Sequence, residues 1–213
     1  MPCGITKITI KILHTESYKI TCFMAGECGI FYDKNIPKNR NMRAIVQRVK
    51  NAQVSVNGGI IGQIGKGLLV YLGVGRDDDE TDAVFIADKI VNLRIFADSE
   101  GKMNPVRDKA SEMPDGRQGR PVSNRMNLSV KDTAGQILVI SNFTLFGDCR
   151  KGRRPGFDLA AQPETAEKLY EKVVELVKAE GLEVQTGVFA AYMDVTAAND
   201  GPINFLLDSK RQF

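Results

Sequence analysis

The chain has 213 residues, of which 43% are hydrophobic and 26% are charged, and its formal net charge is +3. This composition is ordinary for one globular domain with a packed core, and so small a net charge does not by itself predict nucleic-acid binding. No apolar run approaches the roughly 18 residues that a membrane-spanning helix requires, so we expect no membrane partner.

Cysteine and histidine usage narrows the chemistry. The four cysteines form no CxxC pair, which argues against a zinc site, and no secretory signal accompanies them, which argues against a disulfide framework. The cysteines are Cys3, Cys22, Cys28 and Cys149. We therefore expect a cytoplasmic protein that has no metal and no cofactor.

The first 41 residues differ from the rest of the chain. They have weak periodicity and end in the polar run KNIPKNRN, whereas Met42 opens the alternating pattern MRAIVQRVKNAQVSV. Residues 1–41 are either a real extension or a translated leader that precedes a true start at Met42. Transit peptides are rich in arginine and poor in acids, and this segment is neither, which favours the second interpretation. We predict one domain over residues 42–213, preceded by an N-terminal extension over 1–41 whose presence in the mature protein is doubtful.

Alternating hydrophobicity predicts strands early in this domain. Arg43–Val49 and Gln53–Val56 fit strands on either side of a turn, and Asn57-Gly58-Gly59 is a strong hairpin signal. Ile60–Ile64 is then the returning strand, and Leu68–Val74 is the next one.

A helix is predicted after the acidic run Asp77–Glu80, because negative charge favours a helix N-terminus. Leu93–Phe96 is predicted as a short strand. The apolar face of the helix consists of Ala83, Ile86, Ala87 and Ile90.

The segment from Met103 to Asn127 is rich in Pro, Gly and charge and has no apolar face, which is typical of an exposed loop. We predict an insertion at about residues 105–125. It is a basic arm for RNA or a solvated loop, and the composition favours the solvated loop.

The second half predicts one buried strand, one clear helix and two final strands. Gln136–Asn142 is the buried strand, and the helix begins at Pro163 and ends before Gly181. Val188–Val195 and Ile203–Leu207 are the last strands, joined through AANDGP. The apolar stripe of the helix is Ala166, Leu169, Tyr170, Val173, Leu176 and Val177. These elements predict an α+β fold with a mainly antiparallel sheet and two or three helices.

The stretch ISNFTLFGDCRKGRRPGF places hydroxyl residues at the end of a strand and a cluster of positive charge after it. This arrangement suits an anionic partner beside a small polar pocket. Taken alone, Ser141 and Thr144 are more often turn residues than catalysts, and such a basic cluster is more often a solvated surface. The cluster consists of Arg150, Lys151, Arg153 and Arg154.

Several common kinds of catalytic site are absent. The only histidine is His14, so a Ser-His-Asp triad is not available in the domain, and Cys149 has no histidine to activate it. The stretch GGIIGQIGKG fails the P-loop pattern because Gly67 stands where a hydroxyl residue is required. Any enzyme of this sequence therefore depends on main-chain groups, such as N–H donors that hold a developing oxyanion, or on the substrate itself.

In chain order, the sequence contains the motifs MRAIVQRV, GLLVYLGV, NLRIF, GKMN, NLSV, SNFTLFGDCRKGRRPGF, TGVF and NDGP. The chain resembles the D-aminoacyl-tRNA deacylases, because these motifs have the order seen in that family. The resemblance covers Met42 to about Ser209, apart from the loop at Pro105–Arg125. It implies a barrel-like α+β homodimer that hydrolyses the ester between a D-amino acid and tRNA and, in many members, also removes glycine from mischarged tRNA.

The resemblance also implies a site. Its catalytic residues are Ser141, Asn142, Phe143 and Thr144, with help from the terminal ribose 2′-hydroxyl of the RNA. The residues implied in substrate binding and chiral selection are Arg43, Gly201 and Pro202. The Gly201–Pro202 bond is expected to be cis and to enter the pocket of the other subunit. Contacts with tRNA fall to Arg150, Lys151, Arg153 and Arg154.

Two residues depart from the family's motifs: Asn142 stands in place of Gln, and Asn204 in place of Thr. If selection is by backbone, both changes are tolerated. If either side chain positions the adenosine, affinity suffers. The alternative function is therefore a dimer of the same fold that binds charged tRNA and has weakened catalysis.

Overall fold

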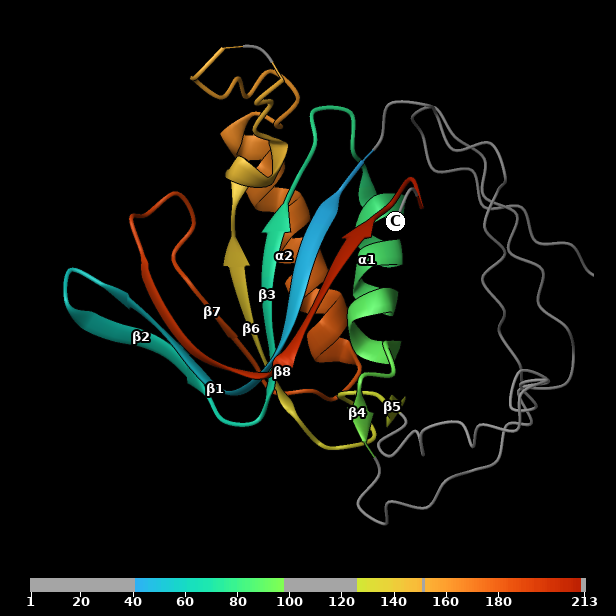
Figure 1. Ribbon diagram of the computed structural model, residues 1–213. Helices are drawn as coiled ribbons and strands as arrows, with labels where there is room; N and C mark the ends of the chain where they lie inside the picture. The colour runs from blue at the N-terminus through green and yellow to red at the C-terminus, as the bar shows by residue number, and fades with distance from the viewer. Residues whose placement is uncertain (1–40, 98–125, 151, 212–213) are drawn as a thin grey trace, which may run out of the picture. The chain divides into compact units, whose positions relative to one another are not determined.

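The computed structural model describes residues 41–97, 126–150 and 152–211 (Figure 1). In chain order, the elements of this described part are β1 (Arg43–Val56), β2 (Gly59–Ile64), β3 (Gly67–Gly73), α1 (Glu80–Asn92), β4 (Phe96–Ala97), β5 (Met126–Leu128), β6 (Gln136–Ser141), the 3-10 turn η1 (Phe143–Phe146), α2 (Pro163–Ala179), β7 (Val184–Thr186) and β8 (Asp194–Asp208).

The main sheet is mixed and is organised around β1. This long strand pairs antiparallel with β2, β3 and β8, while β3–β6 and β6–β7 are parallel pairs. β4 and β5 form a separate antiparallel pair. The predicted α+β, barrel-like sheet with mostly antiparallel pairing and two helices is confirmed, and the two parallel pairs are an addition to it.

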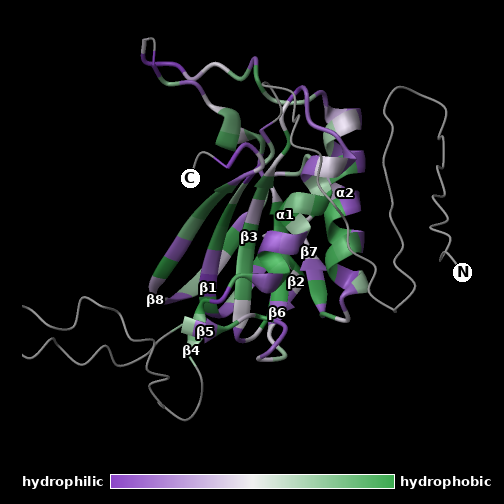
Figure 2. Ribbon diagram, turned by 90° about the vertical axis from the view of Figure 1, so that its right-hand side faces the viewer, coloured by the Kyte–Doolittle hydropathy of each residue, from purple (hydrophilic) through white to green (hydrophobic). Residues whose placement is uncertain are grey.

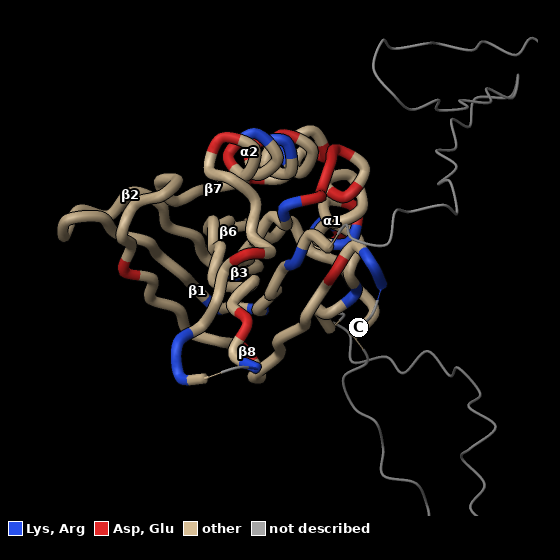
Figure 3. Tube along the Cα trace, turned by 90° about the horizontal axis from the view of Figure 1, so that it is seen from above, with Lys and Arg blue, Asp and Glu red and all other residues tan. Residues whose placement is uncertain are grey.

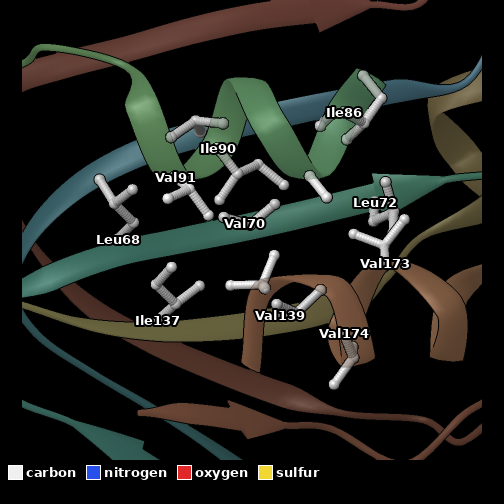
Figure 4. Packing of buried hydrophobic residues seen from close by; sticks show 14 of the residues in the cluster. Leu68, Val70, Leu72, Ile86, Ile90, Val91, Ile137, Val139, Val173 and Val174 are labelled. Atoms are coloured by element: carbon white, nitrogen blue, oxygen red, sulfur yellow. The ribbon is translucent and has the colours of Figure 1, made fainter. Parts of the chain in front are cut away.

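Both helices lie on the same side of the main sheet (Figures 1 and 3). The pleat of β3 divides the core, because alternate residues of a strand point to opposite faces. Leu68, Val70 and Leu72 pack in the cluster that includes the helices, whereas Leu69 belongs to a second cluster on the other face. Figure 4 shows Val70 and Leu72 of β3 among side chains of α1, such as Ile90, and of α2, such as Val173.

The first residues of each helix explain where that helix begins. The Asp79 side chain caps α1 by accepting from the Thr81 N–H, and Asp82 completes a capping box. Pro163 occupies the first turn of α2, where the missing N–H has no cost. The predicted apolar faces are turned inward in both helices (Figure 2).

Two strand predictions are wrong in the same way. The segments Arg43–Val49 and Gln53–Val56 are one continuous strand, β1, and AANDGP lies inside the single strand β8. Register shifts in the β1–β8 pair between Gln47 and Val49 and between Val49 and Asn51 accommodate the residues that broke the alternation. β-bulges of this kind add residues to one strand without ending the pairing.

Other boundaries differ less. The predicted strand Val188–Val195 begins only at Asp194, and the predicted strand Leu93–Phe96 is reduced to β4. The extension over 1–41, apart from Asn41, and the insertion at 105–125 lie outside the described residues.

Candidate active site

The turn η1 follows directly from the end of β6 (Figure 1). The Asn142 N–H donates to the Leu72 carbonyl over 2.8 Å, so the parallel pairing with β3 continues one residue past β6. A Cβ on Gly73 would lie 2.9 Å from the Asn142 carbonyl oxygen and 3.1 Å from the Leu145 Cβ. The turn therefore sits directly on glycine backbone at the end of β3.

The Asn142 side chain caps this turn. Its Oδ1 accepts from the Thr144 N–H over 3.1 Å and also from the Thr144 hydroxyl. The Phe143 N–H, by contrast, has no acceptor within the described part of the chain. Both N–H groups are candidate oxyanion donors; among the described residues, that of Phe143 has no acceptor and that of Thr144 is occupied by Asn142.

The turn presents an aromatic side chain to solvent. Phe143 is 59% exposed, and its ring meets that of Phe157 edge-on at a centroid distance of 5.0 Å. Ser141 lies half-buried at the end of β6. The structure thus places Ser141, Asn142, Phe143 and Thr144 together, which follows from their being consecutive residues at the end of a strand.

Arg43 lies at this turn and not at the Gly-Pro segment. Its Nη1 donates to the Leu145 carbonyl over 2.7 Å, and its guanidinium carbon lies 4.8 Å from the centre of the Phe146 ring. Within the chain, Arg43 faces Asp208 on β8, and Gly201 and Pro202 of the same subunit lie farther along the strand pair. The strand register sets this separation, because Arg43 starts β1 whereas the Gly-Pro segment lies opposite the middle of β1.

Arg48 is the arginine beside the Gly-Pro segment. Its Nε lies 2.9 Å from Asp200 Oδ2, an ion pair without hydrogen-bond geometry, and its Nη1 donates to the Ile95 carbonyl over 2.5 Å. Its side chain is only 14% exposed. A signal in the sequence was available, because Arg48 continues the alternation of the buried residues Ala44 and Val46.

The Gly-Pro segment bulges out of the register between β1 and β8. Gln47 pairs with Asn204 and Val49 with Asn199, so residues 200–203 face Arg48 without partners in the register. The Gly201–Pro202 peptide bond is cis. Gly201 has a φ of +131°, and a Cβ there would lie 2.6 Å from the Ile203 Cγ1, so this position requires glycine.

Amide side chains join the two ends of this bulge. Asn204 Oδ1 accepts from Gln47 Nε2 over 3.0 Å and from Asn199 Nδ2 over 2.7 Å. Asn199 Oδ1 in turn accepts from the Ile203 N–H over 3.3 Å. The departure from Thr at Asn204 therefore gives the bulge an additional amide acceptor.

The basic loop after the turn is closed by a bridge between Asp148 and Gly156. Arg150 donates from Nε and Nη2 to the two oxygens of Asp148, over 2.8 and 2.7 Å, and these bonds hold the pKa of the Asp148 carboxyl well below its usual range. Arg153 and Arg154 are exposed and have no ion-pair partner in the described part of the chain. Lys151 lies outside the described residues.

A small cavity of about 150 Å³ lies behind the turn, next to the buried carboxyl of Asp78. Burial raises the pKa of Asp78 to about 6, although the carboxylate accepts from the N–H groups of Asn41 and Gly75. The cavity is lined by Asn41, Gly75, Arg76, Asp77, Phe146, Leu159 and Lys210.

A metal site, a disulfide and a membrane-spanning helix are all absent from the described residues. No three metal-ligating side chains gather within residues 41–97, 126–150 and 152–211, and Cys149 is an exposed free thiol. None of the helices in that part of the chain is long and apolar enough to span a membrane.

Comparison with known proteins adds independent evidence. The family model for D-Tyr-tRNA(Tyr) deacylase matches residues 45–114 and 115–208. The protein named D-aminoacyl-tRNA deacylase from Fervidobacterium nodosum is 52% identical over 172 residues, which cover 81% of this chain and 100% of that protein. The protein of the same name from Clostridioides difficile is 49% identical with the same coverage.

Solved structures agree with the fold. The c-Myc DNA Unwinding Element Binding Protein matches with a TM-score of 0.64 at 34% identity, covering 78% of this chain and 98% of that chain. A probable eukaryotic D-amino acid tRNA deacylase matches with a TM-score of 0.62 at 17% identity, covering 79% and 99%, and supports the fold alone.

These matches, together with the fold, define the class of protein as an α+β enzyme of the aminoacyl-tRNA deacylase kind. Within that class, this chain belongs to the D-Tyr-tRNA(Tyr) deacylase family.

Proposed function

We propose that the chain hydrolyses the ester bond of D-aminoacyl-tRNA in the cytoplasm and releases a free D-amino acid and tRNA. Glycyl-tRNA formed by mischarging is a second substrate, since glycine has no side chain to exclude. The observation that carries the proposal is the turn η1 at the end of β6, where the Phe143 N–H has no acceptor among the described residues, in a chain that is 52% identical to a D-aminoacyl-tRNA deacylase.

The chemistry requires no side-chain nucleophile. Water attacks the ester carbonyl carbon and gives a proton to the neighbouring 2′-hydroxyl of the substrate. This hydroxyl passes its own proton to the departing ribose oxygen as the ester bond breaks, so both ribose hydroxyls are intact in the product. The Phe143 N–H stabilises the charge that develops on the carbonyl oxygen. The Thr144 N–H joins it once Asn142 Oδ1 releases that donor.

The complete site requires two copies of the chain. Arg43 contacts the turn and Arg48 contacts the Gly-Pro segment, and five residues at about 3.3 Å each separate them by about 16 Å along β1. One subunit is thus unable to bring Gly201 and Pro202 to its own turn. A second copy supplies them in a homodimer, and their main chain leaves no room for an L side chain.

Exposed apolar side chains support such a dimer. Phe143 is 59% exposed, Leu206 on β8 is 54% exposed, and Tyr192 before β8 is 89% exposed. A second copy of the chain that covered these side chains would remove their apolar area from water. Arg153 and Arg154 have no ion-pair partner among the described residues and are exposed to tRNA phosphates, while the charge of Arg150 is balanced by Asp148.

The test is deacylation of D-tyrosyl-tRNA and L-tyrosyl-tRNA by the purified full chain with EDTA present. Rapid release of the D-amino acid and none of the L-amino acid supports the proposal. Light scattering measures the mass of the particle, and a monomer that is fully active would contradict the shared site.

A second candidate function is a tRNA-binding dimer with weakened catalysis. The contact between Asn142 Oδ1 and the Thr144 N–H favours it, because this contact occupies one of the two oxyanion donors. Under this alternative, the full chain binds D-tyrosyl-tRNA but leaves its ester bond intact.

A further inference from the structure

The guanidinium of Arg43 is held on three sides. Its Nη1 donates to the Leu145 carbonyl of η1 over 2.7 Å, and its plane lies over the Phe146 ring. The Asn41 amide is assigned the orientation that gives both of its ends complementary partners, and in this orientation its oxygen accepts from Arg43 Nε over 3.1 Å and from Nη2 over 2.8 Å. One side chain thereby links residue 41 to the backbone of the turn.

Asn41 is itself fixed in place. It is only 9% exposed, and its N–H donates over 2.6 Å to the buried carboxyl of Asp78. The next residue is also bound, because the Met42 N–H donates to Ser209 Oγ and the Met42 carbonyl accepts from the Ser209 N–H, both over 3.0 Å. The backbone that carries the Asn41 side chain is therefore held in one position relative to Arg43.

The turn is sensitive to where Leu145 lies. The Leu145 Cβ lies 3.1 Å from the position that a Cβ on Gly73 would take, and the Phe146 ring lies 3.1 Å from the same position on Gly75. An N–H donor is effective only at about 2.7–3.1 Å from the developing oxyanion. A small rotation of the turn on Gly73 and Gly75 would therefore move the Phe143 N–H beyond hydrogen-bond distance of the oxyanion.

We propose that Asn41 is a positioning residue, which orients η1 by holding the Arg43 guanidinium on the Leu145 carbonyl. This inference rests on the proposed deacylase function, since the orientation matters because the turn carries the oxyanion donors. It gives Arg43 a role at the turn of its own subunit, and it extends the site to a residue that touches no substrate.

The kinetic test compares Asn41→Ala and Asn41→Asp in the full chain, with D-tyrosyl-tRNA as substrate. Alanine removes the acceptor, whereas aspartate keeps it with the same shape. We expect Asn41→Ala to lower kcat about tenfold, a change of about 1.4 kcal/mol, while KM stays within about twofold. Asn41→Asp should restore kcat. The matched control is Asn92→Ala, which removes an exposed amide that donates to Asp88 on α1.

A double-mutant cycle separates the relay from general packing. Arg43→Lys keeps the charge but loses the planar fork of N–H donors that spans Asn41 and Leu145. If the relay is real, the double variant Arg43→Lys with Asn41→Ala loses no more activity than either single variant. Additive losses, or a loss in Asn41→Ala that Asn41→Asp fails to restore, would overturn the proposal.

Hydrogen exchange of the amides of residues 143–147 provides a readout that does not need activity. We expect Asn41→Ala to raise their exchange rate about tenfold, with Asn41→Asp and Asn92→Ala close to the parent chain. If the parent chain fails to cleave D-tyrosyl-tRNA, the proposed function fails, and this readout still decides the relay. Unchanged exchange in Asn41→Ala would refute the relay even in an active enzyme.

Discussion

Arg48 and Asp200 join β1 to β8 next to the Gly-Pro segment, with 2.9 Å between Nε and Oδ2. The pair is mostly shielded from water, since the side chains are 14% and 29% exposed. Arg48 also donates to the Ile95 carbonyl, so a single guanidinium connects the bulge of β8 with the segment before β4. The position of Gly201 and Pro202 therefore depends on a side chain of another strand.

Replacing Arg48 with alanine should loosen this bulge. We expect the free energy of unfolding to fall by about 1–3 kcal/mol, because Asp200 loses its partner in a poorly hydrated place. The D over L rate ratio in tyrosyl-tRNA deacylation should fall about tenfold, since a mobile Gly-Pro segment excludes L side chains less well. Urea unfolding and deacylation assays measure the two effects.

The matched control for this change is Arg76→Ala, which breaks the exposed pair between Arg76 and Asp77 at 3.6 Å. An exposed pair contributes less than about 1 kcal/mol, so this variant should keep both stability and selectivity. Equal effects of the two variants would show that the location of Arg48 has no special importance.

Asn142→Gln should raise catalytic activity. The longer side chain is less suited to capping the turn from residue 142, so the Thr144 N–H becomes available to the oxyanion. We expect kcat to rise up to about tenfold, while the weaker cap lowers the free energy of unfolding by about 1 kcal/mol. Single-turnover deacylation of D-tyrosyl-tRNA measures the first effect. A lower kcat would mean that Asn142 itself acts on the substrate.

Much of the fold could be predicted because it follows from local patterns. The apolar stripe of α2 and the hairpin signal at Asn57-Gly58-Gly59 each specify an element without reference to the rest of the chain. The continuity of β1 and β8 could not be predicted in this way. It depends on pairing between strands far apart in sequence, and bulges conceal it by interrupting the alternation.

The candidate site was predictable to the same extent. Ser141 to Thr144 are neighbours in sequence, so their proximity needed no tertiary information. The position of Arg43 did need it, because only the register of β1 against β8 separates Arg43 from the Gly-Pro segment and gives Arg48 that place. Asn is a favoured N-cap residue, but the capping of Thr144 by Asn142 also requires that a turn begin at residue 143, directly after β6.

Arg153 and Arg154 should contribute to tRNA affinity through charge alone. Replacing both with alanine should weaken binding of all tRNAs equally and reduce the slope of log affinity against log salt by about 1 for each phosphate that the variant no longer neutralises. Filter binding across a salt series measures this slope. The matched control is Lys172→Ala with Lys178→Ala, which removes the same charge from α2. An unchanged slope in the arginine variant would place the tRNA elsewhere.

Asp78 should make stability depend on pH. Burial raises its pKa to about 6 in the folded chain from 3.8, with smaller contributions from the negative charges of Asp82 and Asp79. Between these values, the folded chain binds more protons than the unfolded chain. The free energy of unfolding therefore decreases as pH rises from about 4 to about 6, by about 2–3 kcal/mol for this group.

Asp78→Asn isolates this effect, because the other carboxyl groups titrate in both proteins and cancel in the difference. We expect the parent chain to lose stability relative to Asp78→Asn between pH 4 and pH 6, with a constant difference above pH 7. Urea unfolding at a series of pH values gives both curves. A difference that grows in the parent's favour as pH rises would mean that the N–H groups of Asn41 and Gly75 outweigh burial and lower the pKa of Asp78.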